Sequence, residues 1–151
     1  MDPVEPNADI DLSLENQLCF ALTVASRTVV QAYRPVLEPL GLTHPQYLVM
    51  LALWDHNPLS VKEVSAQLLH EPATISPLLR RLEDMGYVRR TPNTQDARAL
   101  DVELTAEGLA LKEKARAVPP AMMKRLKLTR EEVMVLNKAM HNLIEAATAD
   151  A

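Results

Sequence analysis

The chain has 151 residues and a formal net charge of −4; 48% of its residues are hydrophobic, 24% are charged and 3% are aromatic. This composition excludes an intrinsically disordered chain and fits one packed domain, with or without dimerising extensions. With only three glycines and so few aromatic residues, it favours a mostly helical protein over a β-sandwich.

Charge is distributed unevenly along the chain. Five arginines and three acidic residues lie between Pro72 and Arg98, so this window has a net charge of +2 and the remainder has −6. Exposed charges more than about 10 Å apart are largely screened in salt solution, so a basic centre can attract phosphate despite the acidic total. Arginine also suits forked contacts with phosphate and guanine.

Cys19 is the only cysteine, which excludes an intrachain disulfide and a cysteine-rich zinc site. The four histidines lack metal-ligand spacing, and we expect no metal and no cofactor. Residues 1–12 are acidic and contain two prolines, which predicts a disordered leader and not a signal peptide. The longest apolar run, Tyr47–Trp54, is too short to cross a bilayer. We expect a soluble cytoplasmic protein without membrane contacts.

Two helices are predicted first. Ser13 is a plausible N-cap for a helix that runs to about Leu37 and ends before Gly41. Pro45 suits the first turn of a second helix, which reaches Trp54.

Two short helices and a hairpin follow. A capping box at residues 60–63 opens a helix to about residue 69, and a second helix spans about 73–85 with Gly86 as its C-cap. Two strands, 87–91 and 99–104, flank a polar tip.

The end of the chain is helical. Thr105 caps a helix that runs to about Val118, after which Pro119 and Pro120 are expected to interrupt the helical structure. A second capping box, at residues 129–132, opens a last helix. Its apolar face consists of Val133, Leu136, Met140, Leu143 and Ile144.

This order of elements predicts a mostly α fold with a small β-hairpin wing, a winged helix-turn-helix. The second helix of such a unit enters the major groove, and the wing reaches the flanking backbone or minor groove. The predicted contacts are Thr74, Ser76, Pro77, Arg80, Arg81, Arg89, Arg90 and Arg98. A solvated surface helix and a winged helix that binds protein remain alternatives.

A family resemblance is carried by five segments: LENQLCF (14–20), YRP (33–35), PQYL (45–48), SPLLRRLE (76–83) and DAR (96–98). They resemble the MarR family and, around Cys19, its one-cysteine branch of OhrR-type organic-hydroperoxide-sensing repressors. The resemblance covers the chain from about Leu14 to the last helix and adds Asp96 of the wing to the predicted DNA-contacting set.

The resemblance also implies an architecture and a function. Residues 13–151 would form a single domain, in which 13–44 and 105–151 supply dimerisation helices and 45–104 form the DNA-binding lobe. The homodimer would bind a pseudo-palindromic operator in double-stranded DNA as a repressor, and it would not be an enzyme.

For sensing, the resemblance implies that a hydroperoxide oxidises the Cys19 thiolate and thereby releases the operator. The family pattern uses tyrosine hydroxyls as donors to the thiolate, and Tyr33 matches one of them. Tyr33 is fourteen residues from Cys19, about 21 Å along a straight helix. The pair can therefore meet only across two subunits. We expect Cys19 in the second turn, where the positive end of the helix dipole is fading.

Two residues depart from the branch pattern, because His44 and Thr23 stand where pocket tyrosines occur. A protonated His44 would stabilise the thiolate more strongly than a phenol and make sensing pH-dependent; the alternative is a solvent-facing residue at a helix start. Thr23 would enlarge the pocket or admit water.

Because the chain has no second cysteine, we expect a sulfenic acid that is followed by a mixed disulfide with a low-molecular-weight thiol or by overoxidation. Other interpretations stay open. Cys19 could be a small buried hydrophobe in a MarR-type repressor released by a phenolic or anionic ligand. A thiol peroxidase is disfavoured, since the sequence offers neither a nearby catalytic arginine nor a resolving cysteine.

Overall fold

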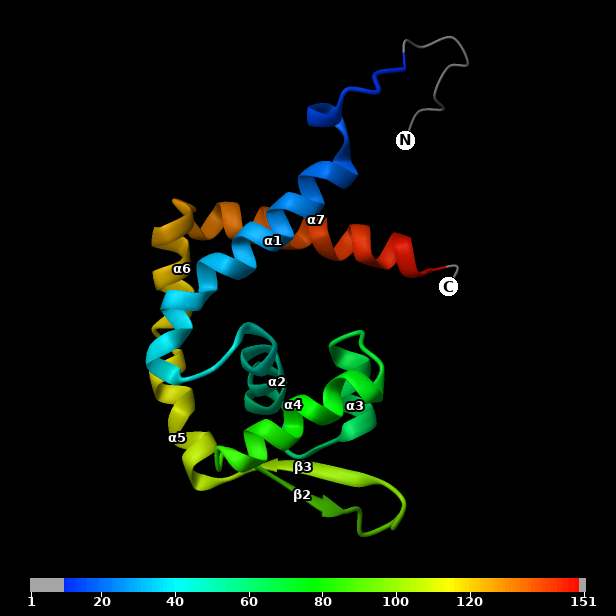
Figure 1. Ribbon diagram of the computed structural model, residues 1–151, viewed down its shortest axis with the longest axis vertical. Helices are drawn as coiled ribbons and strands as arrows, with labels where there is room; N and C mark the ends of the chain where they lie inside the picture. Colours follow the sequence, from blue (N-terminus) through cyan, green and yellow to red (C-terminus); the bar gives the residue numbers. More distant parts are fainter. Residues whose placement is uncertain (1–9, 150–151) are drawn as a thin grey trace.

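The computed structural model describes residues 10–149. Residues 1–9 of the expected disordered leader therefore lie outside the described residues. Figure 1 shows a lower lobe, which contains the sheet and three short helices, and two long helices, α1 and α7, that cross each other in this view at the opposite end. Two further helices, α5 and α6, run along one side and connect the lobe to α7.

The order of elements confirms the mostly α, winged fold. The helices are α1 (Leu18–Leu37), α2 (His44–Asp55), α3 (Val61–Gln67), α4 (Pro72–Asp84), α5 (Ala106–Ala115), α6 (Val118–Leu126) and α7 (Arg130–Thr148), with 3₁₀ turns η1 (Leu14–Asn16) and η2 (Glu38–Leu40). The strands are β1 (Leu59–Ser60), β2 (Val88–Pro92) and β3 (Leu100–Leu104). They form one antiparallel sheet in the order β1-β3-β2, with Val88 opposite Leu104 and Leu59 opposite Val102.

Capping boxes fix three helix starts. The boxes expected at Ser60 and Thr129 are both present, and a third at Thr43 starts α2 ahead of Pro45. In each box the N-cap hydroxyl accepts a backbone N–H and the side chain three residues later accepts the N-cap N–H. A cap of this kind contributes about 1 kcal/mol.

The start of α1 differs from the prediction. Ser13 does not cap a long helix, because its hydroxyl and its N–H donate to the Asp11 carboxylate at 2.6 and 2.8 Å. The chain makes only the short turn η1, Gln17 is extended, and α1 begins at Leu18. Cys19 therefore lies in the first turn of α1 and not in the second.

The prolines act differently from the prediction. Pro119 and Pro120 do not interrupt the helical structure but occupy the first turn of α6, where no intrahelical N–H donor is needed. Pro72 likewise begins α4. The break after α5 is therefore a helix start, and the connection from the lobe to α7 contains one more helix than expected.

The core lies in the lobe and continues along α5 and α6. Leu53 of α2, Leu79 of α4 and Val102 of β3 are fully buried in it, and Leu37 and Val118 join the end of α1 and the start of α6 to the same core. The apolar side of α4 is buried at Ile75, Leu79 and Leu82, whereas Met85, just after the helix, is exposed.

Most of α1 and all of α7 lack such packing. The only buried residue of α1 is Leu37, and α7 has none. Large apolar side chains on these helices are exposed: Leu18, Val30, Met134, Val135, Leu136, Met140 and Ile144. Within residues 10–149, no helix is both long enough and apolar enough to cross a membrane.

Gly108 forms a tight junction between the wing and α5. The Thr105 hydroxyl accepts the Gly108 N–H at 3.1 Å and donates to the carbonyl oxygen of Gly86 at 2.5 Å. The Trp54 indole donates to the Gly108 carbonyl oxygen at 2.9 Å. A Cβ at position 108 would overlap the carbonyl oxygen of Tyr87, so only glycine fits here.

Gly108→Ala tests this junction. Where space allows, replacing a helical glycine by alanine stabilises a protein by about 0.5–1 kcal/mol. Here we expect the overlap with Tyr87 to lower the free energy of unfolding by about 1–3 kcal/mol, measured by urea denaturation. Ala110→Gly, at an exposed position of the same helix, is the control and costs about 1 kcal/mol from helix propensity alone. A variant as stable as the wild type would contradict the packing described.

Candidate functional site

The predicted contact residues of α4 share one solvent-facing side. Thr74, Pro77, Arg80 and Arg81 are exposed and Ser76 is partly exposed. Together with Ala73 and Asp84 most of them line a shallow hollow of about 420 Å³ along the helix. Arg80 and Arg81 form no ion pair with any residue between 10 and 149. The α4 helix therefore offers two free guanidinium groups on the side away from the core.

The tip of the wing is held by a hydrogen-bonded turn. The Asn93 side-chain oxygen accepts the N–H groups of Gln95 and Asp96 at 2.8 and 3.0 Å, and its amide donates to the Asp101 carboxylate at 3.0 Å. Asp96 accepts the Arg98 N–H at 3.0 Å. Asp96 thus positions the backbone of Arg98, whose side chain is exposed. Sequence reasoning missed Asn93, although an asparagine that opens a tight turn is a signal for such a bond.

The two arginines of β2 differ in their surroundings. Arg89 lies 3.3 Å from Glu103, and because both side chains are well exposed, at 62% and 42%, this pair is weak and leaves Arg89 accessible. Arg90 is only 20% exposed, and both its guanidinium and its N–H donate to one oxygen of Glu83 at 3.1 Å. Arg90, predicted to contact phosphate, therefore fastens β2 to α4.

Cys19 is a free and exposed thiol in the first turn of α1. No residue of its own chain between 10 and 149 encloses this thiol. The Thr23 hydroxyl donates to the carbonyl oxygen of Cys19 at 2.7 Å, so this hydroxyl is directed at the helix backbone.

Tyr33 and His44 lie together at the opposite end of α1. Their ring centroids are 5.1 Å apart, and Tyr47 continues the cluster at 6.0 Å from Tyr33. Because α1 is one continuous helix from Leu18 to Leu37, Cys19 stays about 21 Å from Tyr33 along its axis. The structure therefore brings together two of the three predicted sensing residues and leaves the thiol apart. Tyr47, which sequence reasoning gave no role, belongs to the same aromatic cluster.

Burial sets the protonation of this cluster. It raises the pKa of Tyr33 and of Tyr47, and the neighbouring Tyr33 raises that of Tyr47 further. Burial lowers the pKa of His44 below its ordinary value of 6.5. At neutral pH the cluster thus presents neutral O–H and N–H donors. The expected protonated His44 is disfavoured in the single chain, and its half-buried ring is not a solvent-facing residue.

Known proteins share this fold and much of the sequence. The MarR family model matches residues 42–100. The organic hydroperoxide resistance transcriptional regulator of Bacillus subtilis is 39% identical over 134 residues, which cover 89% of this chain and 91% of that protein.

Two solved structures are similar over most of this chain. The overoxidized AbfR bound to DNA, whose source is Staphylococcus epidermidis, has 34% identity and a TM-score of 0.70, and the match covers 88% of this chain and 94% of AbfR. A cysteine-to-serine MarR variant from E. coli complexed with operator DNA has 25% identity and a TM-score of 0.77, with 89% and 99% covered. The chain therefore belongs to the MarR family of winged helix-turn-helix transcriptional regulators.

Proposed function

We propose that the protein is a homodimeric DNA-binding repressor, released from its operator when a hydroperoxide oxidises Cys19. The observation that carries this proposal is the presence in one chain of two separate features: an α4 face with two arginines that form no ion pair within residues 10–149, and a single exposed thiol on α1. The B. subtilis relative is named for organic hydroperoxide resistance, and AbfR has been solved overoxidized on DNA.

DNA binding follows from the exposed side of α4 and from the wing. In the major groove, Thr74 and Ser76 at the start of α4 would face base edges, while Arg80 and Arg81 would neutralise phosphates. Arg98 at the wing tip would enter the flanking minor groove. A symmetric dimer presents two such lobes, which matches a pseudo-palindromic operator.

The dimer is supported by apolar surface that one chain leaves uncovered. The α7 helix exposes Met134, Val135 and Leu136, and α1 exposes Leu18 next to the thiol. Patches of this kind mark interfaces in soluble proteins. If the two α1 helices pack antiparallel, the Cys19 thiol of each chain approaches the Tyr33 and His44 pair of the other.

The chemistry requires a thiolate, which Tyr33 O–H and neutral His44 N–H would stabilise as donors. The thiolate sulfur attacks the outer oxygen of the hydroperoxide, the O–O bond breaks, and an alcohol leaves after taking up a proton. The product is a sulfenic acid at Cys19. Because His44 begins α2 and α2 contacts α4, a change at this donor pair reaches the DNA-contacting helix through one rigid element.

Release by a small aromatic anion is a second candidate, favoured by one feature. A hollow of about 300 Å³ between α2 and α5 is lined by Tyr47 and Trp54 and by the cations Lys112 and Arg116. Such a ligand would release DNA whether or not Cys19 is present.

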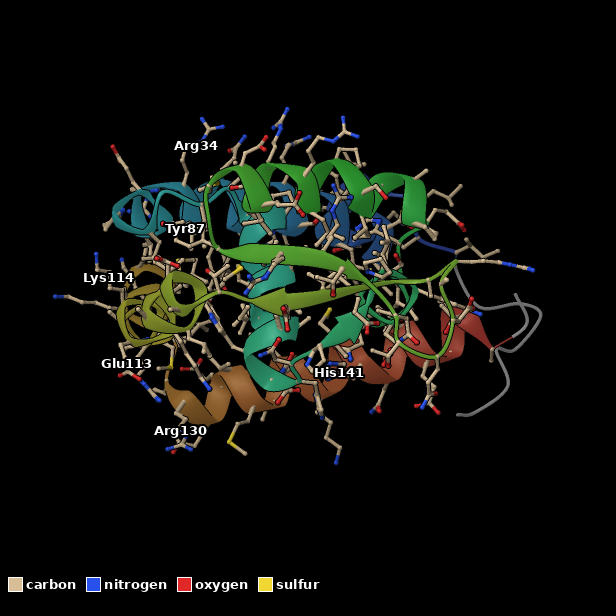
Figure 2. The ribbon with its side chains drawn as sticks, turned by 90° about the horizontal axis from the view of Figure 1, so that it is seen from below. Arg34, Tyr87, Glu113, Lys114, Arg130 and His141 are labelled. Atoms are coloured by element: carbon tan, nitrogen blue, oxygen red, sulfur yellow. The ribbon has the colours of Figure 1, made fainter. Side chains whose placement is uncertain are left out.

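Arg80→Gln tests the DNA surface. We expect operator affinity at least about fivefold weaker near physiological salt, and a plot of log K against log salt shallower by about 1.8, because each of the two subunits loses one phosphate contact. Arg130→Gln is the matched control, since Figure 2 shows Arg130 on the edge of the molecule opposite α4. Fluorescence anisotropy over a salt series gives both quantities. An unchanged slope of log K against log salt for Arg80→Gln would contradict the proposed phosphate contact.

Cys19→Ser tests the signal. We expect this variant to bind the operator as tightly as the wild type and to stay bound after treatment with cumene hydroperoxide, which should release the wild type. A gel shift with and without oxidant measures this. If the serine variant responds like the wild type, cysteine oxidation is not the signal, and titration with salicylate then tests the aromatic-anion alternative.

His44→Gln tests the electrostatics of the aromatic cluster. Because burial lowers the pKa of His44, the unfolded chain takes up a proton at this residue at a higher pH than the folded chain. This contribution to stability is complete above about pH 6.5 and is lost as the pH falls toward the folded-state pKa. We expect the wild type to lose more free energy of unfolding than the variant between about pH 7 and pH 5. An NMR titration midpoint at or above 6.5 for His44 would contradict the direction of the shift.

A further inference from the structure

A third hollow is lined in part by His44, the partner of Tyr33 in the aromatic cluster. It measures about 560 Å³ and is enclosed by the C-terminal half of α1, the loop that follows it, and the start of α2. Gln31 and Arg34 line it from α1, Glu38 lines it from the turn η2, and Thr43 and His44 line it from the α2 side. Its volume falls in the range of small-molecule sites.

The wall formed by α1 and η2 carries one charge of each sign. Arg34 and Glu38 are one helical turn apart, yet neither forms an ion pair with the other or with any other residue in the described part of the chain. Figure 2 shows Arg34 extending outward from the ribbon into solvent. A guanidinium binds a carboxylate through two parallel N–H donors, and a carboxylate binds an ammonium group. Two such free groups one turn apart complement a small zwitterion.

We propose that this hollow binds the zwitterionic end of an α-amino-acid thiol of the L-cysteine type and directs its sulfur to the oxidised Cys19 of the partner subunit. The carboxylate would lie against Arg34 and the ammonium group against Glu38, with the thiol toward His44. This inference rests on the proposed function, because the Cys19 that reacts comes from the second chain.

The reaction forms a mixed disulfide. The sulfur of the bound thiol attacks the sulfur of the Cys19 sulfenic acid, an S–S bond forms, and the S–O bond breaks. The hydroxyl group leaves with the thiol proton as water, so the sulfenic sulfur is reduced and the incoming sulfur is oxidised. Since this chain has no resolving cysteine, selection of the incoming thiol falls to the residues around the site.

The experiment compares four thiols on the full chain after oxidation with one equivalent of cumene hydroperoxide. L-Cysteine carries both charges, 3-mercaptopropionate only the carboxylate, cysteamine only the ammonium group, and 2-mercaptoethanol neither. Rapid-quench intact mass spectrometry gives the rate constant of mixed-disulfide formation for wild type, Arg34→Gln, Glu38→Gln and the control Arg27→Gln. Arg27 is an exposed arginine of α1 outside the hollow. The ratio of variant to wild type for each thiol cancels that thiol's intrinsic reactivity.

We expect Arg34→Gln to slow L-cysteine and 3-mercaptopropionate by about two- to fivefold and to leave the other two thiols unchanged. Glu38→Gln should slow L-cysteine and cysteamine by a similar factor, and Arg27→Gln should change none. Equal ratios for all four thiols would overturn the assignment of the hollow.

Trapping of the sulfenic acid with dimedone separates the two proposals. If Cys19 is trapped but the thiols are not discriminated, oxidation of Cys19 stands and the hollow is not a thiol site. If the hydroperoxide gives no trapped Cys19, the proposed function fails and the inference fails with it.

Discussion

The unbroken length of α1 is the constraint on which the other features depend. It runs from Leu18 to Leu37 without interruption, and its rise of about 1.5 Å per residue separates Cys19 from the Tyr33 and His44 pair by about 21 Å. Pro35 lies inside the last turn, yet the helix continues to Leu37. A helix of this kind cannot fold back on itself, so a site that joins thiol and aromatic donors needs a second copy of α1. In the proposed mechanism, sensing and dimerisation therefore depend on the same surface.

The α2 helix connects that site to the DNA-contacting lobe. Its first residue is His44, and near its other end the Trp54 indole donates to the Gly108 carbonyl oxygen of α5 at 2.9 Å. Between these ends its buried side chains pack in the same core as Leu79 and Leu82 of α4. A close-packed core transmits displacement because it has few voids to absorb it. This packing is the route by which a change at His44 would alter the orientation of α4 in the proposed mechanism.

The Tyr33 and His44 pair, which is proposed to meet the thiol of the partner subunit, consists of uncharged donors. Burial keeps Tyr33 protonated and His44 unprotonated at neutral pH, while the Thr23 hydroxyl is occupied by the Cys19 carbonyl. The charged residues Arg34 and Glu38 line the adjacent hollow. Under the two proposals above, selectivity among incoming thiols depends on these charges, whereas reactivity depends on the hydrogen bonds to the thiolate.

Local patterns in the sequence determined most of the fold. The capping boxes at Ser60 and Thr129, the glycine at position 86 and the alternation in β3 each act over a few residues, so they could be predicted without the fold. The family resemblance, which is also a match of local segments, supplied Cys19, Tyr33 and His44 as candidate sensing residues.

Tertiary structure decided features that depend on groups meeting through space. The two residues of β1 are too few for a pattern and form a strand only because β3 lies beside them. Ser13 donates hydrogen bonds to the Asp11 carboxylate and does not cap α1. The ion pair with Glu83 holds the Arg90 side chain largely out of solvent. The neutral state of His44 comes from burial beside Tyr33. In each case the deciding partner is set by packing or by a competing hydrogen bond, which neither residue spacing nor helix periodicity encodes.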